Sequence, residues 1–341
     1  MQDVTLVGID LGKHSFHLHG QDRKGKAIFR KKVGRKQLIE FFANFPACTV
    51  VMEACAGAHH MARKLASFGH QVKLISPQFV RPFVKSNKND FVDAEAICEA
   101  ASRPAMRFVT PKTESQQTLS ALHRVRESLI RDRTKVINQI HGFLLEFGIS
   151  LPIGTAVIKR LPATLAEHPL PPRLVAVLER LHGHFKHLDT QIGEIDRELV
   201  RQLAEDEVGQ RLLTIPGVGP ITASVLAAEM GNGQQFGCSR DFAASIGLVP
   251  RQYGTGGKAN LLGISKRGDK NIRRLLVQCA RAYMMRLDRQ TGRLADWVRG
   301  LLMRRHSNVV ACALANKLAR TAWALAAHHT TFNPGPARLP A

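Results

Sequence analysis

The stretch VTLVGIDLGKHSFHLHGQDRKGKAIFRKKV, residues 4–33, decides the fold of the N-terminal part of the chain. It contains three short runs rich in β-branched and apolar residues, VTLVGID, HSFHLHGQ and KAIFRKKV. Such runs predict three successive strands joined as a meander. Two further apolar runs, CTVVMEA (48–54) and QVKLIS (71–76), follow helical stretches. This order of elements predicts an α/β domain across residues 1–112.

The rest of the chain predicts helices. Residues 113–207 repeat apolar residues at helical spacing on either side of the Pro-rich break HPLPP. They predict a coiled-coil-like helical hairpin, exposed enough to act as a dimerisation arm. Residues 208–330 predict a mainly helical domain with one Gly-rich interruption, and residues 331–341 a flexible tail.

The composition points to a polyanionic partner. The 341 residues include 49 Lys and Arg against 27 Asp and Glu, a formal net charge of +22. With 44% hydrophobic residues, the chain can form real cores, and so much positive charge indicates nucleic acid as the partner. No apolar run is long enough to span a bilayer, and the N-terminus does not have the pattern of a signal peptide. The six cysteines form no CxxC pair. We therefore expect reduced thiols and a cytoplasmic, nucleoid-associated protein without a membrane partner.

Four acids stand at the ends of predicted elements. Asp10 closes the strand VGID, Glu53 closes VVME, and Asp90 and Asp93 begin the helix of KNDFVDAEAI on one face. Carboxylates delivered from two strand ends and a helix start can converge, and they would repel one another without cations between them. Two Mg²⁺ ions about 4 Å apart would suit phosphodiester chemistry. A turn or helix cap is the alternative for each acid taken singly, above all for Glu53 and Asp90.

The histidines near these acids suggest a second metal cluster. His14, His17 and His19 follow a strand alternation, however, and His59 and His60 are adjacent in the chain. We expect a surface role for all five.

Two Gly-rich segments in the C-terminal part suggest contacts with phosphates. LTIPGVGPITASVLAAEM has the form of a helix-hairpin-helix turn, in which Gly217 and Gly219 allow a close approach to a DNA backbone. A tight turn between packed helices is the alternative. The second segment, RQYGTGGKANLLGISKRG, does not match a nucleotide-binding loop, since Gln252 stands where such a loop needs its first glycine and Ala259 where it needs a hydroxyl. It is expected to be a flexible loop that carries Thr255.

The motif blocks GIDLGK, MEACAG and KNDFVDAEAI resemble the RuvC-like DEDD domain of transposases in the insertion sequence 110 family. IPGVGPITASVLAAEMG, GLVPRQYGTGGK and GISKRGDKNIRRLL are similar to the C-terminal domain of that family, and GGK suggests the subgroup named after insertion sequence 1111. The resemblance covers nearly the whole chain. It implies an RNase H-like fold in which Asp10, Glu53, Asp90 and Asp93 hold Mg²⁺.

The resemblance also implies an activity and partners. Family members excise their own element and insert it site-specifically, directed by a structured bridge RNA that pairs with target and donor DNA. A serine in the Gly-rich loop attacks the scissile phosphate and holds the DNA end covalently. The aligned position here is Thr255, with Ser265 as the other candidate, and an inactive copy is a third possibility. The resemblance further implies a dimer or tetramer whose site combines the DEDD domain of one protomer with the loop of another.

Several basic residues are expected at phosphates, where they would also stabilise transition-state charge. They are Arg251, Lys258, Lys266, Arg267, Arg273 and Arg274. For any one of them, a solvated basic face is the alternative.

Three other classes of protein compete with a recombinase. A structure-specific nuclease would use the four acids alone, with water as the nucleophile. GIDLGK also opens actin-like sugar kinases, but their second phosphate loop and adenosine motif are not found in this sequence. A non-catalytic RNA-binding protein would have no use for the four acids.

Overall fold

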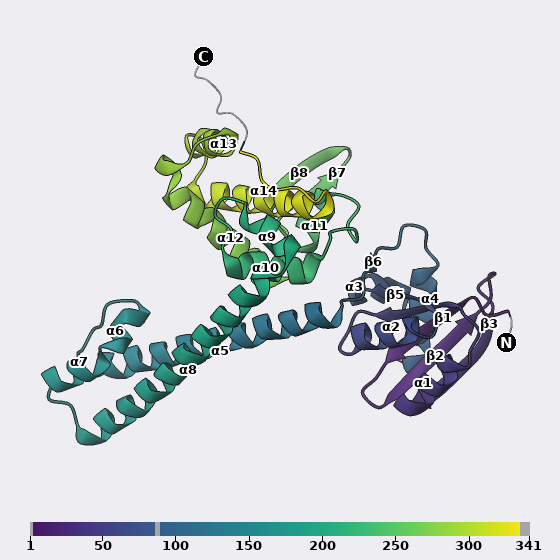
Figure 1. The fold of residues 1–341 in the computed structure, drawn as a ribbon, viewed down its shortest axis with the longest axis horizontal. Helices are drawn as coiled ribbons and strands as arrows, with labels where there is room; N and C mark the ends of the chain where they lie inside the picture. The colour runs from purple at the N-terminus through teal and green to yellow at the C-terminus, as the bar shows by residue number, and fades with distance from the viewer. Residues whose placement is uncertain (1–2, 86–88, 335–341) are drawn as a thin grey trace, which may run out of the picture. The chain divides into compact units, whose positions relative to one another are not determined.

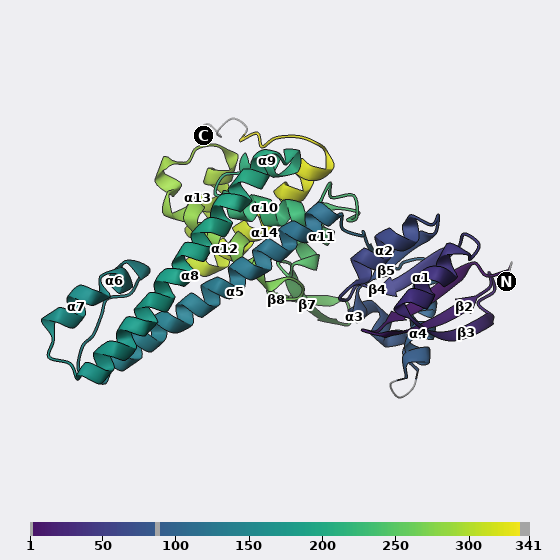
Figure 2. The same ribbon diagram turned by 60° about the horizontal axis from the view of Figure 1, so that its bottom comes forward.

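The computed structural model describes residues 3–85 and 89–334, drawn as a ribbon in Figures 1 and 2. The chain divides into two compact units, Met1–Gln117 and Thr118–Ala341. None of the helices it describes carries an apolar stretch long enough to cross a membrane. Of the predicted tail, residues 335–341 lie outside the described part, whereas Phe332 packs against the core of the second unit.

The N-terminal unit is built on a six-stranded sheet with the order β3-β2-β1-β4-β5-β6. Its strands are β1 (Leu6–Leu11), β2 (Ser15–Gln21), β3 (Ala27–Gly34), β4 (Thr49–Glu53), β5 (Gln71–Ile75) and β6 (Phe108–Val109). The first three are antiparallel neighbours, β4 and β5 run parallel to β1, and β6 is antiparallel to β5. The predicted meander and mixed α/β domain are confirmed.

Helices cover both faces of this sheet (Figure 2). They are α1 (Arg35–Ala43), α2 (Ala58–Ala66), α3 (Pro77–Val80), η1 (Arg81–Phe83) and α4 (Asp90–Ala101). On one face, Ile9 and Met52 belong to a core that includes Phe42 of α1 and residues of α2. On the other face, Val51 packs with Ile97 of α4. Because successive strand residues point to opposite faces, the central strands are buried on both sides.

Two long helices, α5 and α8, lie side by side (Figures 1 and 2), and apart from the first four residues of α5 both belong to the second unit. They and the short helices between them are α5 (Glu114–Leu145), α6 (Thr155–Lys159), α7 (Leu161–Glu167) and α8 (Pro172–Ala204). Arg133 of α5 donates to Asp189 of α8 at 2.5 Å, and Arg126 pairs with Asp196. Phe185 is fully buried in the apolar core between these helices.

The C-terminal body of this unit is mainly helical, as the sequence predicts. Its elements are α9 (Glu207–Leu213), α10 (Pro220–Met230), α11 (Ser239–Ser245), β7 (Pro250–Thr255), β8 (Lys258–Ile264), α12 (Lys270–Met285), η2 (Leu287–Arg289), α13 (Arg293–Leu302) and α14 (Ser307–Ala327). The helices share one apolar core, in which Leu276 and Ala319 are fully buried. His123 of α5 joins this body through a 3.0 Å contact between its Nε2 and the Oγ of Ser224 in α10.

Candidate metal centre and exposed hairpin

Three polar side chains gather at one end of the sheet on the face covered by α4. Asp10 lies near the end of β1, and the register of the sheet places His17 of β2 directly opposite it. Glu53 ends the neighbouring parallel strand β4. Residues two apart in a strand point to the same face of the sheet. Because Val51 packs beneath α4, Glu53 points to the face covered by α4. The pairing of β1 with its two neighbours therefore brings these side chains together.

Helix α4 begins beside this group and adds two more acids. Asn89 caps the helix by accepting a hydrogen bond from the N–H of Phe91 at 3.0 Å, and Asp90 and Asp93 lie in the first turn. The helix packs very closely on β1, because a Cβ on Gly8 would lie 2.4 Å from the carbonyl oxygen of Ala94. This close approach sets the height of the two acids above the sheet.

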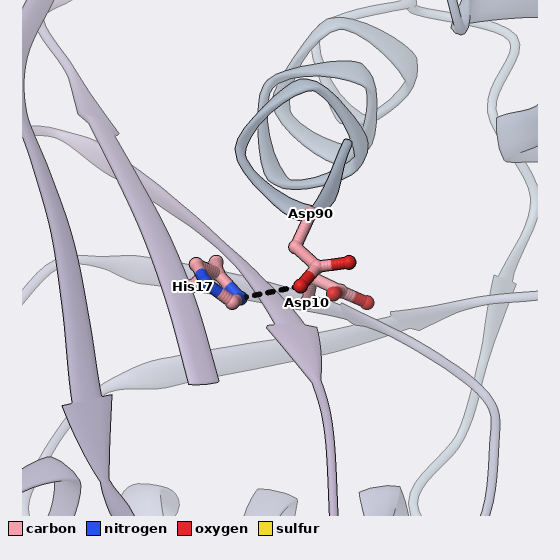
Figure 3. A group of neighbouring side chains, drawn as sticks. All are labelled: Asp10, His17 and Asp90. Atoms are coloured by element: carbon pink, nitrogen blue, oxygen red, sulfur yellow. Dashed lines mark ion pairs between the residues drawn. The ribbon is translucent and has the colours of Figure 1, made fainter. Parts of the chain in front are cut away.

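Asp10, His17 and Asp90 form a tight cluster (Figure 3). One possible ligand atom from each lies within 4.8 Å of the other two. The Nδ1 of His17 is 3.5 Å from the Oδ2 of Asp90. His17 is buried, whereas the side chain of Asp90 is 54% exposed. The cluster is thus held from inside the fold and remains open to a ligand from solvent.

Glu53 connects the remaining acids to this cluster. Burial raises the pKa of its carboxyl group, and the charges of Asp10 and Asp93 raise the pKa further. All four predicted acids therefore lie at the same end of the sheet. Carboxylate oxygens are the ligands that hard divalent cations prefer, and a cation would relieve the repulsion at Glu53. The donor set thus fits divalent metal ions.

The prediction of a surface role for the histidines is wrong for two of them. His14 and His60 are exposed as expected, but only 5% of His17 and 3% of His19 are accessible to solvent. Helix α4 covers the face of β2 that the His-x-His alternation suggested was solvated. His59 is half-buried and accepts a hydrogen bond from the N–H of Lys112 at 3.0 Å.

The Gly-rich loop is a β-hairpin, which the sequence reasoning missed. Strands β7 and β8 are joined by Gly256 and Gly257, whose φ angles are +57° and +78°. Two such residues in succession form the tight turn whose twist matches that of paired strands. Thr255 ends β7 at this turn, is exposed, and lies directly opposite Lys258. The dipeptide Gly-Gly was the signal in the sequence that could have identified the turn.

Ser265, the other candidate hydroxyl, has a different environment. Its N–H donates to the carbonyl of Val249 at 2.8 Å, and its Oγ is buried without a hydrogen-bond partner among the described residues. The next residue, Lys266, has a φ of +57°, which is uncommon for a residue with a side chain. Thr255 therefore presents its hydroxyl to solvent, whereas Ser265 does not.

The predicted phosphate-binding residues fall into two groups. Arg251, Lys258, Lys266, Arg267 and Arg274 are exposed. Arg273 is 8% exposed and donates to the carbonyl oxygens of Ile246 and Arg267, each at 2.9 Å. Its guanidinium therefore braces the segment after β8 from within, whereas the surface positions of the other five leave them accessible to a phosphate.

The turn between α9 and α10 has the glycines that the sequence singled out. Gly217 has a φ of +84°, and a Cβ there would lie 2.9 Å from the carbonyl oxygen of Cys279 in α12. Gly219 caps α10 with an ordinary φ of −95° and open space where a Cβ would lie. Packing against α12 thus explains Gly217, while a phosphate contact at either glycine stays a prediction.

Comparison with known proteins agrees with this arrangement. A family model described as "Transposase" of the DEDD type matches residues 7–149, and one described as "Transposase IS116/IS110/IS902 family" matches residues 209–295. The chain is 66% identical to the transposase for insertion sequence element IS1328 of Yersinia enterocolitica, over 98% of this chain and 100% of that protein. The chain is also 45% identical to a probable family 20 transposase of Pseudomonas aeruginosa, over 98% of this chain and 100% of that protein.

The transposase for insertion sequence element IS1111A of Coxiella burnetii is also similar, with 43% identity over 98% of this chain and 93% of that protein. The matched ranges therefore lie in both units, and they cover the positions of the four acids and of the exposed hairpin. The chain belongs to the IS116/IS110/IS902 family of transposases, enzymes that recombine DNA.

Proposed function

We propose that this transposase excises its own insertion sequence and inserts it site-specifically by Mg²⁺-dependent cleavage and rejoining of DNA strands. The observation that carries the proposal is the convergence of Asp10, Glu53, Asp90 and Asp93 at one end of the sheet. These four residues would hold the metal, with two ions per site. When bound, Mg²⁺ supplies positive charge that orients the phosphodiester and stabilises the charge of its transition state. The strand order with a central parallel pair supports an RNase H-like domain.

Thr255 is proposed as the nucleophile. Its Oγ attacks the scissile phosphorus, the Oγ–P bond forms, and the bond from phosphorus to the 3′ oxygen breaks. The proton of the threonine hydroxyl passes to solvent, and the departing 3′ oxygen takes up a proton. The products are a 5′-phosphothreonyl DNA end and a free 3′-OH. A 3′-OH of the exchanged strand then reverses the linkage, so the reaction needs no ATP.

The hairpin supports this assignment. Directly opposed residues of an antiparallel pair have side chains on the same face, so Lys258 and Thr255 share one face of the turn. The ammonium group of Lys258 can therefore stabilise the charge that develops on the attacked phosphate. The methyl group of threonine crowds an in-line attack more than the side chain of a serine would, and the exposed position of Thr255 at the turn counteracts this crowding.

The partners of the reaction are proposed on the same basis. A formal charge of +22 and five exposed basic residues on or near the hairpin favour a DNA and RNA partner over a small substrate. We propose that a structured RNA from the element guides the choice of target and donor, and that the enzyme works as a dimer or tetramer. An adjacent structured non-coding segment in the DNA flanking the gene is the expected source of this RNA.

Covalent trapping tests the proposal. Purified protein is mixed with Mg²⁺, the flanking-derived RNA and labelled DNA that spans the element junction, then denatured and analysed by mass spectrometry. We expect a DNA adduct on Thr255 that is absent from Thr255→Ala and from Asp10→Ala. Thr255→Ser, which keeps the hydroxyl and removes the methyl, should form the adduct at least as fast as the wild type.

The other outcomes separate the alternatives. An adduct on Ser265 would keep the class of enzyme and move the nucleophile. Metal-dependent cleavage without an adduct, unchanged in Thr255→Ala, would make water the nucleophile and the protein a nuclease. Asp10→Ala alone does not distinguish these two, because both need the metal.

A further inference from the structure

His17 is a buried imidazole at the candidate metal centre, and no step of the proposed reaction uses it. It lies on β2 opposite Asp10, and its ring meets the ring of Phe91 edge-on at 4.7 Å between centroids. The strand pairing and Phe91, in the first turn of α4, hold the imidazole in place from two sides. A buried and fixed histidine at this position requires an explanation.

His70, another buried histidine, has polar partners within the core on both ring nitrogens. The Nδ1 of His70 faces the backbone N–H of Cys48 at 3.3 Å, and its Nε2 is 2.9 Å from the carbonyl oxygen of Phe42. His17 differs, because its Nδ1 faces the Asp90 carboxylate, which is about half exposed at the mouth of the site. The chemistry around His17 is therefore that of a ligand site rather than of a satisfied core.

The distances suit a metal ion. Ligand atoms of Asp10, His17 and Asp90 lie within 4.8 Å of one another, and the Nδ1 of His17 is 3.5 Å from a carboxylate oxygen of Asp90. Two ligands that bind one Mg²⁺-sized ion at about 2.1 Å lie roughly 3–4 Å apart. Only a small inward movement would place all three atoms around a single ion.

The opposite side of Asp10 has a different donor set. Strand β4 pairs with β1 on the side away from β2, and its Met52 lies opposite Ile9, so Glu53 follows next to Asp10. With Asp93 from the first turn of α4, these residues offer oxygen donors alone. Asp10 thus belongs to two groups, one with oxygen donors alone and one that includes nitrogen. Oxygen donors suit both Mg²⁺ and Mn²⁺, whereas an added imidazole nitrogen favours transition-metal ions such as Mn²⁺ over Mg²⁺.

We propose that His17 supplies a nitrogen ligand to a divalent ion shared with Asp10 and Asp90, which makes this half of the centre selective for Mn²⁺ over Mg²⁺. The other half, formed by Asp10, Glu53 and Asp93, takes Mg²⁺ or Mn²⁺ through oxygen alone. This inference rests on the proposed metal-dependent function and assigns a different donor set to each of the two ions.

The test measures metal binding directly. The full-length protein without nucleic acid is titrated with Mn²⁺ and followed by electron paramagnetic resonance, with pulsed detection of nitrogen nuclei coupled to the ion. We expect a nitrogen coupling in the wild type that changes to the ¹⁵N pattern when histidine is labelled with ¹⁵N. The coupling should be absent in His17→Phe, which keeps the aromatic contact with Phe91. The affinity for Mn²⁺ should fall about tenfold or more, and the affinity for Mg²⁺, measured by competition, should change much less.

Two controls keep the result interpretable. His14→Ala removes an exposed histidine of the β1–β2 connection and should leave the coupling unchanged. His17→Gln can still hydrogen-bond to Asp90 but has no imidazole, so it serves where His17→Phe fails to fold, and it too should lack the coupling.

The remaining outcomes overturn the inference in distinguishable ways. Mn²⁺ that binds in the wild type and is lost in Asp10→Asn, but shows no nitrogen coupling, would reduce His17 to a residue that positions Asp90, and the proposed function would stand. A coupling that persists in His17→Phe would assign the nitrogen to another residue. An absence of Mn²⁺ binding would remove the metal centre itself, and with it both proposals.

Discussion

The carboxyl pKa of Glu53 reflects both its burial and the charges of the neighbouring acids. Its carboxyl pKa is raised by burial first, and then by Asp10 and Asp93. Because the raised value belongs to the folded state, the fold favours the protonated form of Glu53. The resulting stabilisation is complete below the ordinary pKa of a glutamate and is lost as the pH rises through the raised value. The metal-free protein at neutral pH therefore carries an unfavourable charge at this position.

Glu53→Gln should consequently stabilise the metal-free protein. Thermal unfolding in a chelator should give a higher midpoint for the variant at pH 7–8, and the difference should shrink as the pH falls and Glu53 becomes protonated. The same variant should lose the rise in midpoint that Mg²⁺ gives the wild type. A lower midpoint at neutral pH would contradict this account. Glu95→Gln is the matched control, since Glu95 lies on α4 but pairs with the exposed Arg30 at 2.6 Å. It should keep the metal response and cost at most about 1 kcal/mol.

The four acids could be predicted from the sequence, whereas His17 could not. Each acid follows an apolar strand or begins a helix, so the position along the chain indicates the end of the sheet where it lies. His17 lies in a strand whose alternation of His with Phe and Leu is the same for a solvated face and for a covered one. Only the placement of α4 over β2 distinguishes the two, and this is a tertiary feature without a local signal.

At the scale of elements, the hairpin β7–β8 depends on its two-residue turn. Gly256 and Gly257 both have positive φ angles, which cost a residue with a side chain roughly 1–2 kcal/mol. Gly256→Val should therefore disorder the tip and reduce the yield of the Thr255 adduct at least tenfold. Because β7 is exposed along its whole length, the midpoint of global unfolding should change little.

Gly256→Asn is the corresponding control, since asparagine tolerates this conformation in such turns. It should keep most of the adduct. Equal yields for the valine and asparagine variants would show that the tip does not need this turn to present the hydroxyl.

The contact between α5 and α10 predicts a sensitivity to acid. Burial, and after it the charge of Arg126, lowers the pKa of His123 to about 4, although the charge of Asp196 opposes the shift. The lowered value belongs to the folded state, so the stabilisation is present above the ordinary value of 6.5 and is lost as the pH falls toward 4. The free energy of unfolding of the second unit should drop by about 3 kcal/mol across this range.

His123→Gln keeps a partner for Ser224 and removes the titration. Denaturant unfolding of this variant between pH 6.5 and pH 4 should show a shallower decline than that of the wild type. If the free energy of unfolding declined equally in the variant and in the wild type, the acid sensitivity would belong to another residue.

Strands β1, β2 and β4 of the N-terminal sheet were predictable because both of their faces are largely buried and their apolar runs stand out. The hairpin β7–β8 was missed for the opposite reason. Its residues face solvent on both sides, so PRQYGT and KANLLGI have no alternation that indicates pairing. The Gly-Gly dipeptide was the one available signal for the turn. It did not identify the hairpin, because a flexible loop accounts for two successive glycines equally well.

At the scale of the whole molecule, the excess positive charge predicts how binding depends on salt. Each phosphate neutralised by a Lys or Arg makes the plot of log affinity against log salt steeper by about one unit. Replacing five exposed residues with alanine should flatten the slope for DNA by roughly one unit for each phosphate that is no longer neutralised, as measured by fluorescence anisotropy. These residues are Arg251, Lys258, Lys266, Arg267 and Arg274.

A control on another surface tests whether the effect is local. Arg23, Lys24 and Lys26 are exposed in the connection between β2 and β3. Their replacement with alanine lowers the net charge by three and should leave the slope unchanged. An equal flattening per residue would mean that the charge acts through the general field of the protein and not through phosphates bound at the hairpin.

The requirement for glycine at position 8 has a consequence for the copies of this insertion sequence that a genome carries. A Cβ there would lie 2.4 Å from the carbonyl oxygen of Ala94 and 2.7 Å from the Sγ of Cys98, so any larger residue lifts α4 away from β1. Asp90 and Asp93 would move with it, while every acid would still be present in the reading frame. Copies with alanine or valine at position 8 should therefore be unable to transpose. Counting transposition events for such copies and for otherwise identical copies with Gly8 would test this.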